Sequence, residues 1–221
     1  MCKYGPECPL AQICQGTPQF ALNETEIAII IDTHNKIRNK VALGRTAGVP
    51  KAADMCQLEW NNELAAIAQC WANQCEFKHD VCRDIKKGWV GQNIARHGNV
   101  QQSAMADRIT WSKLMGKWYD EYKNFKNGNY AKFAAPEPKS GPTGHFTQLV
   151  WGKTQYIGCG RTFYRDVIDN RHYFIILLVC NYFPGGNTLT LPIYTVGKPV
   201  TKCPVGTAVS DEYKGLCKAN S

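Results

Sequence analysis

Apolar residues recur at helical spacing in three segments of the chain. In the first, Asn23 precedes Glu24 and Glu26, and apolar side chains then follow one stripe as far as Gly44. Asparagine is a preferred helix cap and acidic residues favour the first turn, so the pattern predicts a helix over residues 23–44. We predict two more helices, over residues 61–75 and 104–125. The apolar side of the third carries Trp111, Leu114, Trp118, Tyr122 and Phe125, with Glu121 at its edge.

Alternating patterns predict strands elsewhere. Residues 79–96 read as short strands, most clearly over 90–95, and two longer strands are predicted at 156–164 and 172–182, joined by a polar turn at 166–171. If this hairpin pairs Tyr164 with Ile175, then Cys159 lies opposite Cys180, within reach of a disulfide bond. Residues 1–22, 126–144 and the tail from Gly185 lack periodicity and are predicted to be loops. Within the tail, Cys203 and Cys217 are close enough in sequence to close a small loop.

Composition indicates a globular, extracellular protein. The 221 residues are 44% hydrophobic and 11% aromatic, which excludes a disordered chain. The longest apolar run, 174–179, is far below the roughly 20 residues that a bilayer requires, so no transmembrane segment is expected. Eleven cysteines indicate an oxidising compartment. Because no apolar segment follows Met1, we expect a mature secreted chain.

The net charge of +8, from 26 Lys and Arg against 18 Asp and Glu, does not by itself identify a partner. The basic residues are scattered, and no recognition helix, zinc finger or RNA-binding motif accompanies them. We therefore expect no nucleic-acid partner and interpret the charge as a solvated basic surface. Acidic cell-surface polysaccharides remain an alternative partner.

Common catalytic and metal-binding motifs are absent from the sequence. There is no C-x-x-C pair, no G-x-S-x-G elbow and no H-E-x-x-H helix, so a zinc finger, a serine hydrolase and a zincin are unsupported. The cysteines are instead expected to form disulfides. Asn23-Glu24-Thr25 is the one N-glycosylation sequon, so we predict glycosylation at Asn23.

Four motifs, in order between His34 and Asn187, resemble those of the CAP superfamily, which groups cysteine-rich secretory, antigen 5 and pathogenesis-related proteins. The main signature is similar to residues 144–154, GHFTQLVWGKT, and the second to residues 177–187, LLVCNYFPGGN, although Thr188 departs from the usual pattern. The shorter motifs correspond to residues 34–38, HNKIR, and 91–94, GQNI. Within the superfamily, residues 71–75 and 79–84 resemble insect antigen 5 of venom and saliva.

The resemblance implies an α+β fold, a three-layer α-β-α sandwich, and a division of the chain. We expect a disulfide-stapled amino-terminal arm over residues 1–22, a CAP domain over 23–187 and a cysteine-containing carboxyl-terminal extension over 188–221. It also implies a disulfide between Cys8 and Cys75, and an amino-terminal partner, Cys2 or Cys14, for Cys82. Cys56 and Cys70 are additional to the wasp pattern, and we expect them to pair. One cysteine, Cys2 or Cys14, is then left over, which predicts a monomer or a disulfide-linked dimer.

The family carries a cleft with two histidines and two acidic groups, which in several members binds a divalent metal. The matching residues are His79, His145 and Glu121, whereas Gln92 stands where many relatives have Glu. An amide is neutral and a poor metal ligand, so we expect Zn or Cu to be held weakly. The alternative is that the four residues form only a structural, hydrogen-bonded polar cluster between the sheet and the helices. The motif around His34, together with Asn93 and Asn181, is interpreted as structural.

The first functional hypothesis is a secreted, non-enzymatic binder of a small hydrophobic ligand, such as a fatty acid, eicosanoid or sterol, or of a host target. Its ligand would occupy a channel between the first and third helices, unless the residues there only fill the core. The residues expected to line that channel are Ile30, Ile37, Leu114, Trp118 and Tyr122. The alternatives are metal-dependent hydrolysis or redox chemistry at His79 and His145, disfavoured by Gln92, and a venom or salivary toxin and allergen that acts on a channel or receptor.

Overall fold

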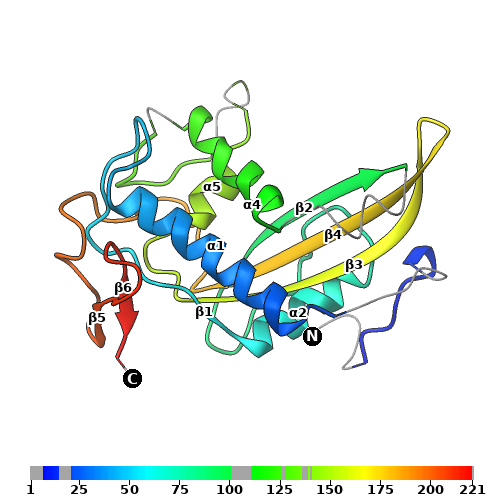
Figure 1. The fold of residues 1–221 in the computed structure, drawn as a ribbon, viewed down its shortest axis with the longest axis horizontal. Helices are drawn as coiled ribbons and strands as arrows, with labels where there is room; N and C mark the ends of the chain where they lie inside the picture. The colour runs from blue at the N-terminus through cyan, green and yellow to red at the C-terminus, as the bar shows by residue number, and fades with distance from the viewer. Residues whose placement is uncertain are drawn as a thin grey trace.

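The computed structural model describes residues 7–14, 21–100, 111–125, 128–135, 139 and 141–220, and it is built around a four-stranded sheet (Figure 1). The strands are β1 (Glu59–Trp60), β2 (Gly91–Asn99), β3 (Tyr156–Ile168) and β4 (Arg171–Phe183), in the spatial order β1-β3-β4-β2. The short β1 runs parallel to β3, and the other pairs are antiparallel.

Alternate side chains of β4 enter two separate apolar cores, one on each face of the sheet. Ile176, Leu178 and Cys180 pack with residues of α1 (Glu24–Ala42), α4 (Trp111–Asp120) and α5 (Gly144–Leu149). Leu177 and Val179 pack with residues of α2 (Asn62–Ala72). Helices therefore cover both faces of the sheet, with α2 opposite α4 and α5 in Figure 1. The predicted α+β fold with three α-β-α layers is confirmed.

The β3–β4 hairpin has the predicted register but a tighter turn. Tyr164 faces Ile175, and Cys159 faces Cys180, to which it is disulfide-bonded. The strands continue to Ile168 and Arg171, beyond the predicted ends. Only Asp169 and Asn170 connect them, both with positive φ (50° and 59°), as the two-residue turns favoured in hairpins require.

The helix α1 follows from its sequence almost residue by residue. The Asn23 side chain accepts from the Glu26 amide, and the Glu26 carboxylate accepts from the Asn23 amide, so the two residues form a capping box. Gly44, with φ 71°, follows the helix and supplies the left-handed conformation common at helix ends. Asn23 is exposed, and its glycosylation stays a prediction.

The helix α2 lies unusually close to the sheet and ends at Ala72, three residues before the predicted end. A Cβ at Gly158 would lie 2.2 Å from the Ala65 nitrogen, and one at Gly160 would lie 2.3 Å from the Gln69 Cα. Two glycines on β3 thus let the helix backbone approach the strand directly.

The predicted third helix is divided in the structure. Its described part comprises α4, which ends at Asp120, and a 3₁₀ turn, η2 (Glu121–Asn124), while residues 104–110 lie outside the described ones. Trp111, Leu114 and Trp118 are buried, as predicted. The strand expected over residues 79–96 begins only at Gly91, and the sequence pattern predicted neither β1 nor α5.

Two of the predicted disulfides are wrong because the amino-terminal arm runs beside the end of α2. The Ala11 amide donates to the Asn73 carbonyl at 2.9 Å, so the arm lies against the end of the helix. Cys8 therefore bonds Cys70, and Cys14 bonds Cys75, rather than Cys8 bonding Cys75. The Cys203–Cys217 disulfide is present, as expected.

Cys56, predicted to pair with Cys70, is instead a buried free thiol. It lies beside α1, where Arg38 donates to its carbonyl, while Cys70 lies on α2 across the sheet. Cys82 is disulfide-bonded, but not to Cys14, which is already paired with Cys75. The prediction for Cys2 lies outside the described residues. Because Cys56 is buried, it cannot supply an intermolecular disulfide.

The carboxyl-terminal extension packs against α1 rather than extending away from the domain. It contains the short strands β5 (Thr207–Val209) and β6 (Cys217–Ala219). The Tyr213 hydroxyl donates to Asp32 at 2.9 Å, and the Gly215 amide donates to the Asn39 side chain at 2.8 Å. The amino-terminal arm contributes a 3₁₀ turn, η1 (Gln12–Cys14). Among the described residues no helix combines the length and apolarity needed to cross a bilayer.

A fully buried arginine connects α1 to the loop between α5 and β3. The five N–H groups of the Arg38 guanidinium make six hydrogen-bond contacts, one hydrogen being shared. Two contacts are to the Cys56 carbonyl and one each to the carbonyls of Leu149, Trp151, Gly152 and Thr154. Burial lowers the pKa of Arg38 to about 10, so the group remains charged at neutral pH. Its charge is compensated by backbone dipoles, since no ion pair to it is found among the described residues.

Replacing Arg38 should therefore destabilise the fold strongly. Arg38→Met retains much of the apolar volume but removes all five N–H donors, and we expect the free energy of unfolding in urea to fall by about 3 kcal/mol or more. Lys36→Met, on the exposed face of the same helix, is the control, and its loss should stay below about 1 kcal/mol. Equal losses in the two variants would contradict the structural role given to Arg38.

Candidate functional site

One half of the candidate site is His145 held by Glu121. α5 carries His145 at its second residue, and η2 begins with Glu121, whose side chain is largely buried. Glu121 Oε1 accepts from His145 Nδ1 at 2.6 Å, and Oε2 accepts from the backbone amides of His145 and Phe146 at 2.9 and 3.2 Å. Both carboxylate oxygens are thus engaged, and the hydrogen of the neutral ring lies on Nδ1.

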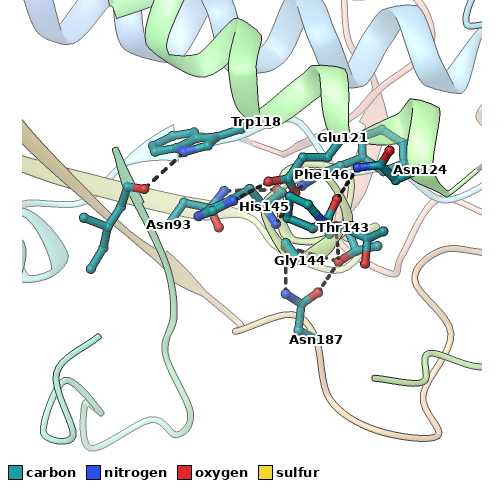
Figure 2. A network of polar contacts seen from close by, with 12 residues as sticks. Asn93, Trp118, Glu121, Asn124, Thr143, Gly144, His145, Phe146 and Asn187 are labelled. Carbon is teal, nitrogen blue, oxygen red and sulfur yellow. Dashed lines mark hydrogen bonds and ion pairs between the residues drawn. The ribbon is translucent and has the colours of Figure 1, made fainter. Parts of the chain in front are cut away.

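The ring and backbone of His145 are also fixed from other directions (Figure 2). Trp118 stacks on the imidazole, with ring centroids 5.9 Å apart and planes inclined by 13°, and its indole N–H donates to the Ile94 carbonyl at 3.3 Å. Asn93 Nδ2 donates to the His145 carbonyl at 3.1 Å. His145 is therefore held by residues of α4, η2 and β2 together.

The other half is His79, which lies at the surface after α2 and is only partly covered, and which is held by the buried Gln92 of β2. His79 Nδ1 lies 2.9 Å from Gln92 Oε1. The Gln92 amide nitrogen donates to Asn181 at 3.0 Å and to Asp80 at 3.3 Å. Because Asp80 is an acceptor only, Gln92 must present its oxygen to the imidazole, so His79 also carries its hydrogen on Nδ1.

Asp80 is itself held by an arginine that sequence reasoning did not select. Arg83 forms an ion pair with Asp80 at 2.8 Å, and its Nε donates to the Val90 carbonyl at 2.8 Å. The guanidinium also lies 5.1 Å from the centroid of the exposed Trp89 ring. The segment that carries His79 is therefore fixed against the start of β2. The spacing Asp80-x-x-Arg83 was the only sequence signal for this pair.

Local electrostatics favour a neutral His79. Partial burial, the largest effect, lowers the pKa of His79, and the positive charge of Arg83 and the proximity of His145 act in the same direction. The hydrogen bond to Gln92 and the charge of Asp80 oppose this shift. A neutral imidazole with its hydrogen on Nδ1 leaves a lone pair on Nε2, the form that binds metals.

The structure thus arranges the four predicted residues, His79, Gln92, Glu121 and His145, here called the tetrad, as two hydrogen-bonded pairs. Glu121 was expected to join the two imidazoles as a third ligand, but both of its oxygens are occupied by His145 and Phe146. Within the described part of the chain, no group of three or more His, Cys, Asp or Glu side chains is arranged to hold a metal.

A model of the cysteine-rich secretory protein family, CAP, matches residues 31–182 of the chain. The protein belongs to the CAP family. The match contains three of the four signature motifs completely and all four tetrad residues, and it lies within the domain predicted at 23–187.

Relatives of this CAP protein include venom allergens. It is 40% identical over 201 residues to a venom allergen 3 homolog of Dinoponera quadriceps, covering 89% of this chain and 83% of that protein. It is 41% identical over 203 residues to venom allergen 5 of Vespa mandarinia, covering 88% and 92%. A CRISP/Allergen/PR-1 protein of Trittame loki is 42% identical over 200 residues, but the match covers 86% of this chain and only 47% of that one.

Solved CAP structures agree with the fold. Na-ASP-1 superposes with a TM-score of 0.70 at 25% identity, covering 94% of this chain and 50% of that one. NaASP2 with Zn²⁺ has a TM-score of 0.69 at 30% identity, covering 91% and 100%. The protein is therefore an antigen 5-like CAP protein. Venom allergens of this kind are secreted, and the disulfide-rich domain is compatible with secretion.

The residues predicted to line an apolar channel are mostly core residues of the CAP domain. Ile30, Leu114 and Trp118 are at most 3% exposed, and Tyr122 packs beside Phe146. Of the predicted five, only Ile37 lines the open groove that does exist between α1 and α4. The five predicted residues therefore do not line one common channel.

This groove, about 480 Å³ in volume, has a mixed lining. Its lining residues are Ile29, Asp32, Thr33, Lys36, Ile37, Lys40, Ser112, Gly116 and Tyr119. Lys40 lies 4.9 Å from the centroid of the Tyr119 ring, and Lys36 pairs with Asp32 at 2.7 Å. A Cβ at Gly116 would meet no atom within 4 Å, so the groove reaches the α4 backbone.

Adding a carboxylate beside His79 should raise the pKa of its imidazole. In Gln92→Glu the new charge lies where the amide oxygen now accepts from Nδ1, and it stabilises the imidazolium, so the pKa of His79 should rise by about 1 to 2. Proton NMR titration of the metal-free protein measures this. Gln12→Glu, which adds the same charge at an exposed position of η1, should leave the His79 titration unchanged. An unmoved pKa in Gln92→Glu would mean that residue 92 does not contact His79.

Proposed function

We propose that this antigen 5-like protein is a non-enzymatic binding protein whose tetrad holds a divalent metal, Zn²⁺ or Cu²⁺, through Nε2 of His79 and of His145. The observation that carries the proposal is the shared arrangement of the two rings. Each directs its Nδ1 hydrogen to a buried acceptor, Gln92 or Glu121. Metal-binding histidines are typically oriented in this way, by a hydrogen bond from the nitrogen that does not bind the metal.

This arrangement gives Gln92 and Glu121 the role of orienting partners rather than ligands. Gln92 provides the acceptor that a glutamate would provide, but without its negative charge, so the site attracts a cation less strongly. Two protein ligands leave the remaining positions of a tetrahedral ion to water, which also favours weak binding. The similarity to NaASP2, whose crystal structure contains Zn²⁺, supports the choice of metal.

The same contacts favour binding over catalysis. A general base must accept a proton from the substrate, and three hydrogen bonds from His145 and Phe146 leave about one of the four acceptor positions of Glu121 for that task. Gln92 has no basic group. Hydrolytic or redox chemistry would thus depend on the metal alone, and we propose it only as the secondary alternative. The similarity to venom allergens supports delivery in venom or saliva.

Calorimetric titration with ZnCl₂ or CuCl₂ tests the metal site. We expect saturable binding to the wild-type protein and none to the His79→Ala, His145→Ala double variant. Glu121→Gln weakens the orienting bonds and should reduce the affinity about tenfold to a hundredfold. Glu63→Gln, an exposed change on α2 with the same loss of charge, serves as the control and should bind as the wild type does. Equal binding heats from the wild type and the double variant would refute the site.

We propose the α1–α4 groove as a second site, for an amphipathic anion such as a fatty acid. Its volume is typical of small-ligand pockets. Ile29, Ile37 and Tyr119 offer apolar surface, while Lys36 and Lys40 can pair with a carboxylate. A glycine inside a helix lowers its stability relative to alanine, and at Gly116 there is open space where a side chain would lie. A glycine at such a position supports the proposal that a ligand occupies this space.

Substitution of Gly116 separates stability from binding at the groove. Gly116→Ala should raise the free energy of unfolding by about 0.5–1 kcal/mol through helix propensity. Gly116→Leu fills the groove and should abolish the uptake of a fluorescent fatty acid such as cis-parinaric acid. Lys36→Gln with Lys40→Gln should weaken uptake, whereas the exposed pair Lys198→Gln with Lys202→Gln should not. Unchanged uptake by Gly116→Leu would place any bound lipid elsewhere.

A further inference from the structure

A chain of buried polar groups joins α1 to the backbone of His145. His34 Nδ1 lies 2.7 Å from the Ile30 carbonyl, and His34 Nε2 lies 2.9 Å from the Tyr182 hydroxyl. The Asn93 side chain lies close enough to the Tyr182 hydroxyl to lower its pKa through a polar contact, which opposes the larger effect of burial. Asn93 Nδ2 then donates to the carbonyl of His145 at 3.1 Å. His34, Tyr182 and Asn93 are each at most 1% exposed, so water does not compete for these contacts.

The directions of the two hydrogen bonds made by His34 are determined. The Ile30 carbonyl only accepts, so His34 carries its hydrogen on Nδ1 and presents a lone pair at Nε2. Burial lowers the pKa of His34 to about 4, which keeps the ring neutral. Tyr182 must therefore donate to His34, and burial raises the pKa of its hydroxyl, which keeps that hydrogen in place. The Tyr182 oxygen is then free to accept from Asn93.

Asn93 consequently links the core to the site. Its amide donates to the His145 carbonyl at 3.1 Å, and its side chain also has a polar contact with Tyr182. Glu121 holds the amide and the ring Nδ1 of the same residue from η2. His145 is therefore clamped at its carbonyl, its amide and its ring, and the carbonyl contact depends on groups that lie deeper in the core.

We infer that Asn93, Tyr182 and His34 are positioning residues for the metal site, because their hydrogen-bonded chain fixes the backbone of His145 and with it the direction of the Nε2 lone pair. This inference rests on the proposed metal function, although none of the three residues touches the metal. It gives a functional role to His34 and Asn93, which their sequence motifs indicated only as structural.

Hydroxyl deletion provides a matched pair of variants. Tyr182→Phe removes the central link and retains the ring. Tyr194→Phe removes a similarly buried hydroxyl, which donates to the Pro50 carbonyl at 2.7 Å and to none of the tetrad residues. Both should lose some thermal stability. We expect Tyr182→Phe to weaken Zn²⁺ binding several-fold, Asn93→Leu to weaken it about tenfold to a hundredfold, and Tyr194→Phe to leave it unchanged. Because the groups act in series, His34→Leu should add little to Tyr182→Phe.

A second measurement keeps the inference distinct from the metal proposal. In metal-free protein, NMR observes the His145 Nδ1 hydrogen, which bridges to Glu121, by its chemical shift and its exchange with water. This signal should shift and exchange faster in Tyr182→Phe and Asn93→Leu, but not in Tyr194→Phe. If wild-type protein binds no Zn²⁺, the metal proposal fails and the NMR signal alone decides the positioning role. If Tyr182→Phe and Tyr194→Phe behave alike in both measurements, the inference is overturned.

Discussion

The burial of one positive charge among backbone carbonyls organises the α1 side of the domain. Arg38 reaches from α1 to residues 149–154, where α5 ends and β3 begins, and to Cys56 on a separate segment. A buried guanidinium must keep its donors hydrogen-bonded, so the positions of these three segments relative to one another are fixed. α5 is only six residues long and could not hold His145 in place by itself. The geometry of the tetrad thus depends on a residue that does not contact it.

The two histidines of the tetrad are hydrogen-bonded by neighbouring residues of a single strand, β2. Along β2, Gln92 lies on the same face as Ile94, which packs toward α2. Asn93 lies on the same face as Ala95, which packs toward α1, α4 and α5. Successive side chains of a strand point to opposite faces. Gln92 therefore meets His79 from the α2 layer, and Asn93 meets His145 from the other layer. The edge of the sheet brings together two helical layers that otherwise share no core.

The sequence predicted most where a local rule determined the result. The capping box at Asn23 and Glu26 defines the start of α1, and the position of Cys159 and Cys180 defines the hairpin register. α5 and β1 were missed because six and two residues are too few to show a period. The arm disulfides failed because the path of residues 8–14 along α2 is set by long-range contacts. The resemblance named the tetrad, but only the Asp80 contact shows that the Gln92 amide directs its oxygen to His79.

Cys56 adds a constraint on how the chain acquires its covalent structure. It forms a parallel bridge with Cys217, so their Cα atoms are about 4.8 Å apart, a separation that a disulfide can span. Cys217 is nevertheless bonded to Cys203, only 14 residues away in the sequence, and Cys56 stays a free thiol. A Cys56–Cys217 bond would exclude the native bond and leave the loop of the extension open. The short separation favours the native bond, because closing a short loop costs less chain entropy than closing a long one.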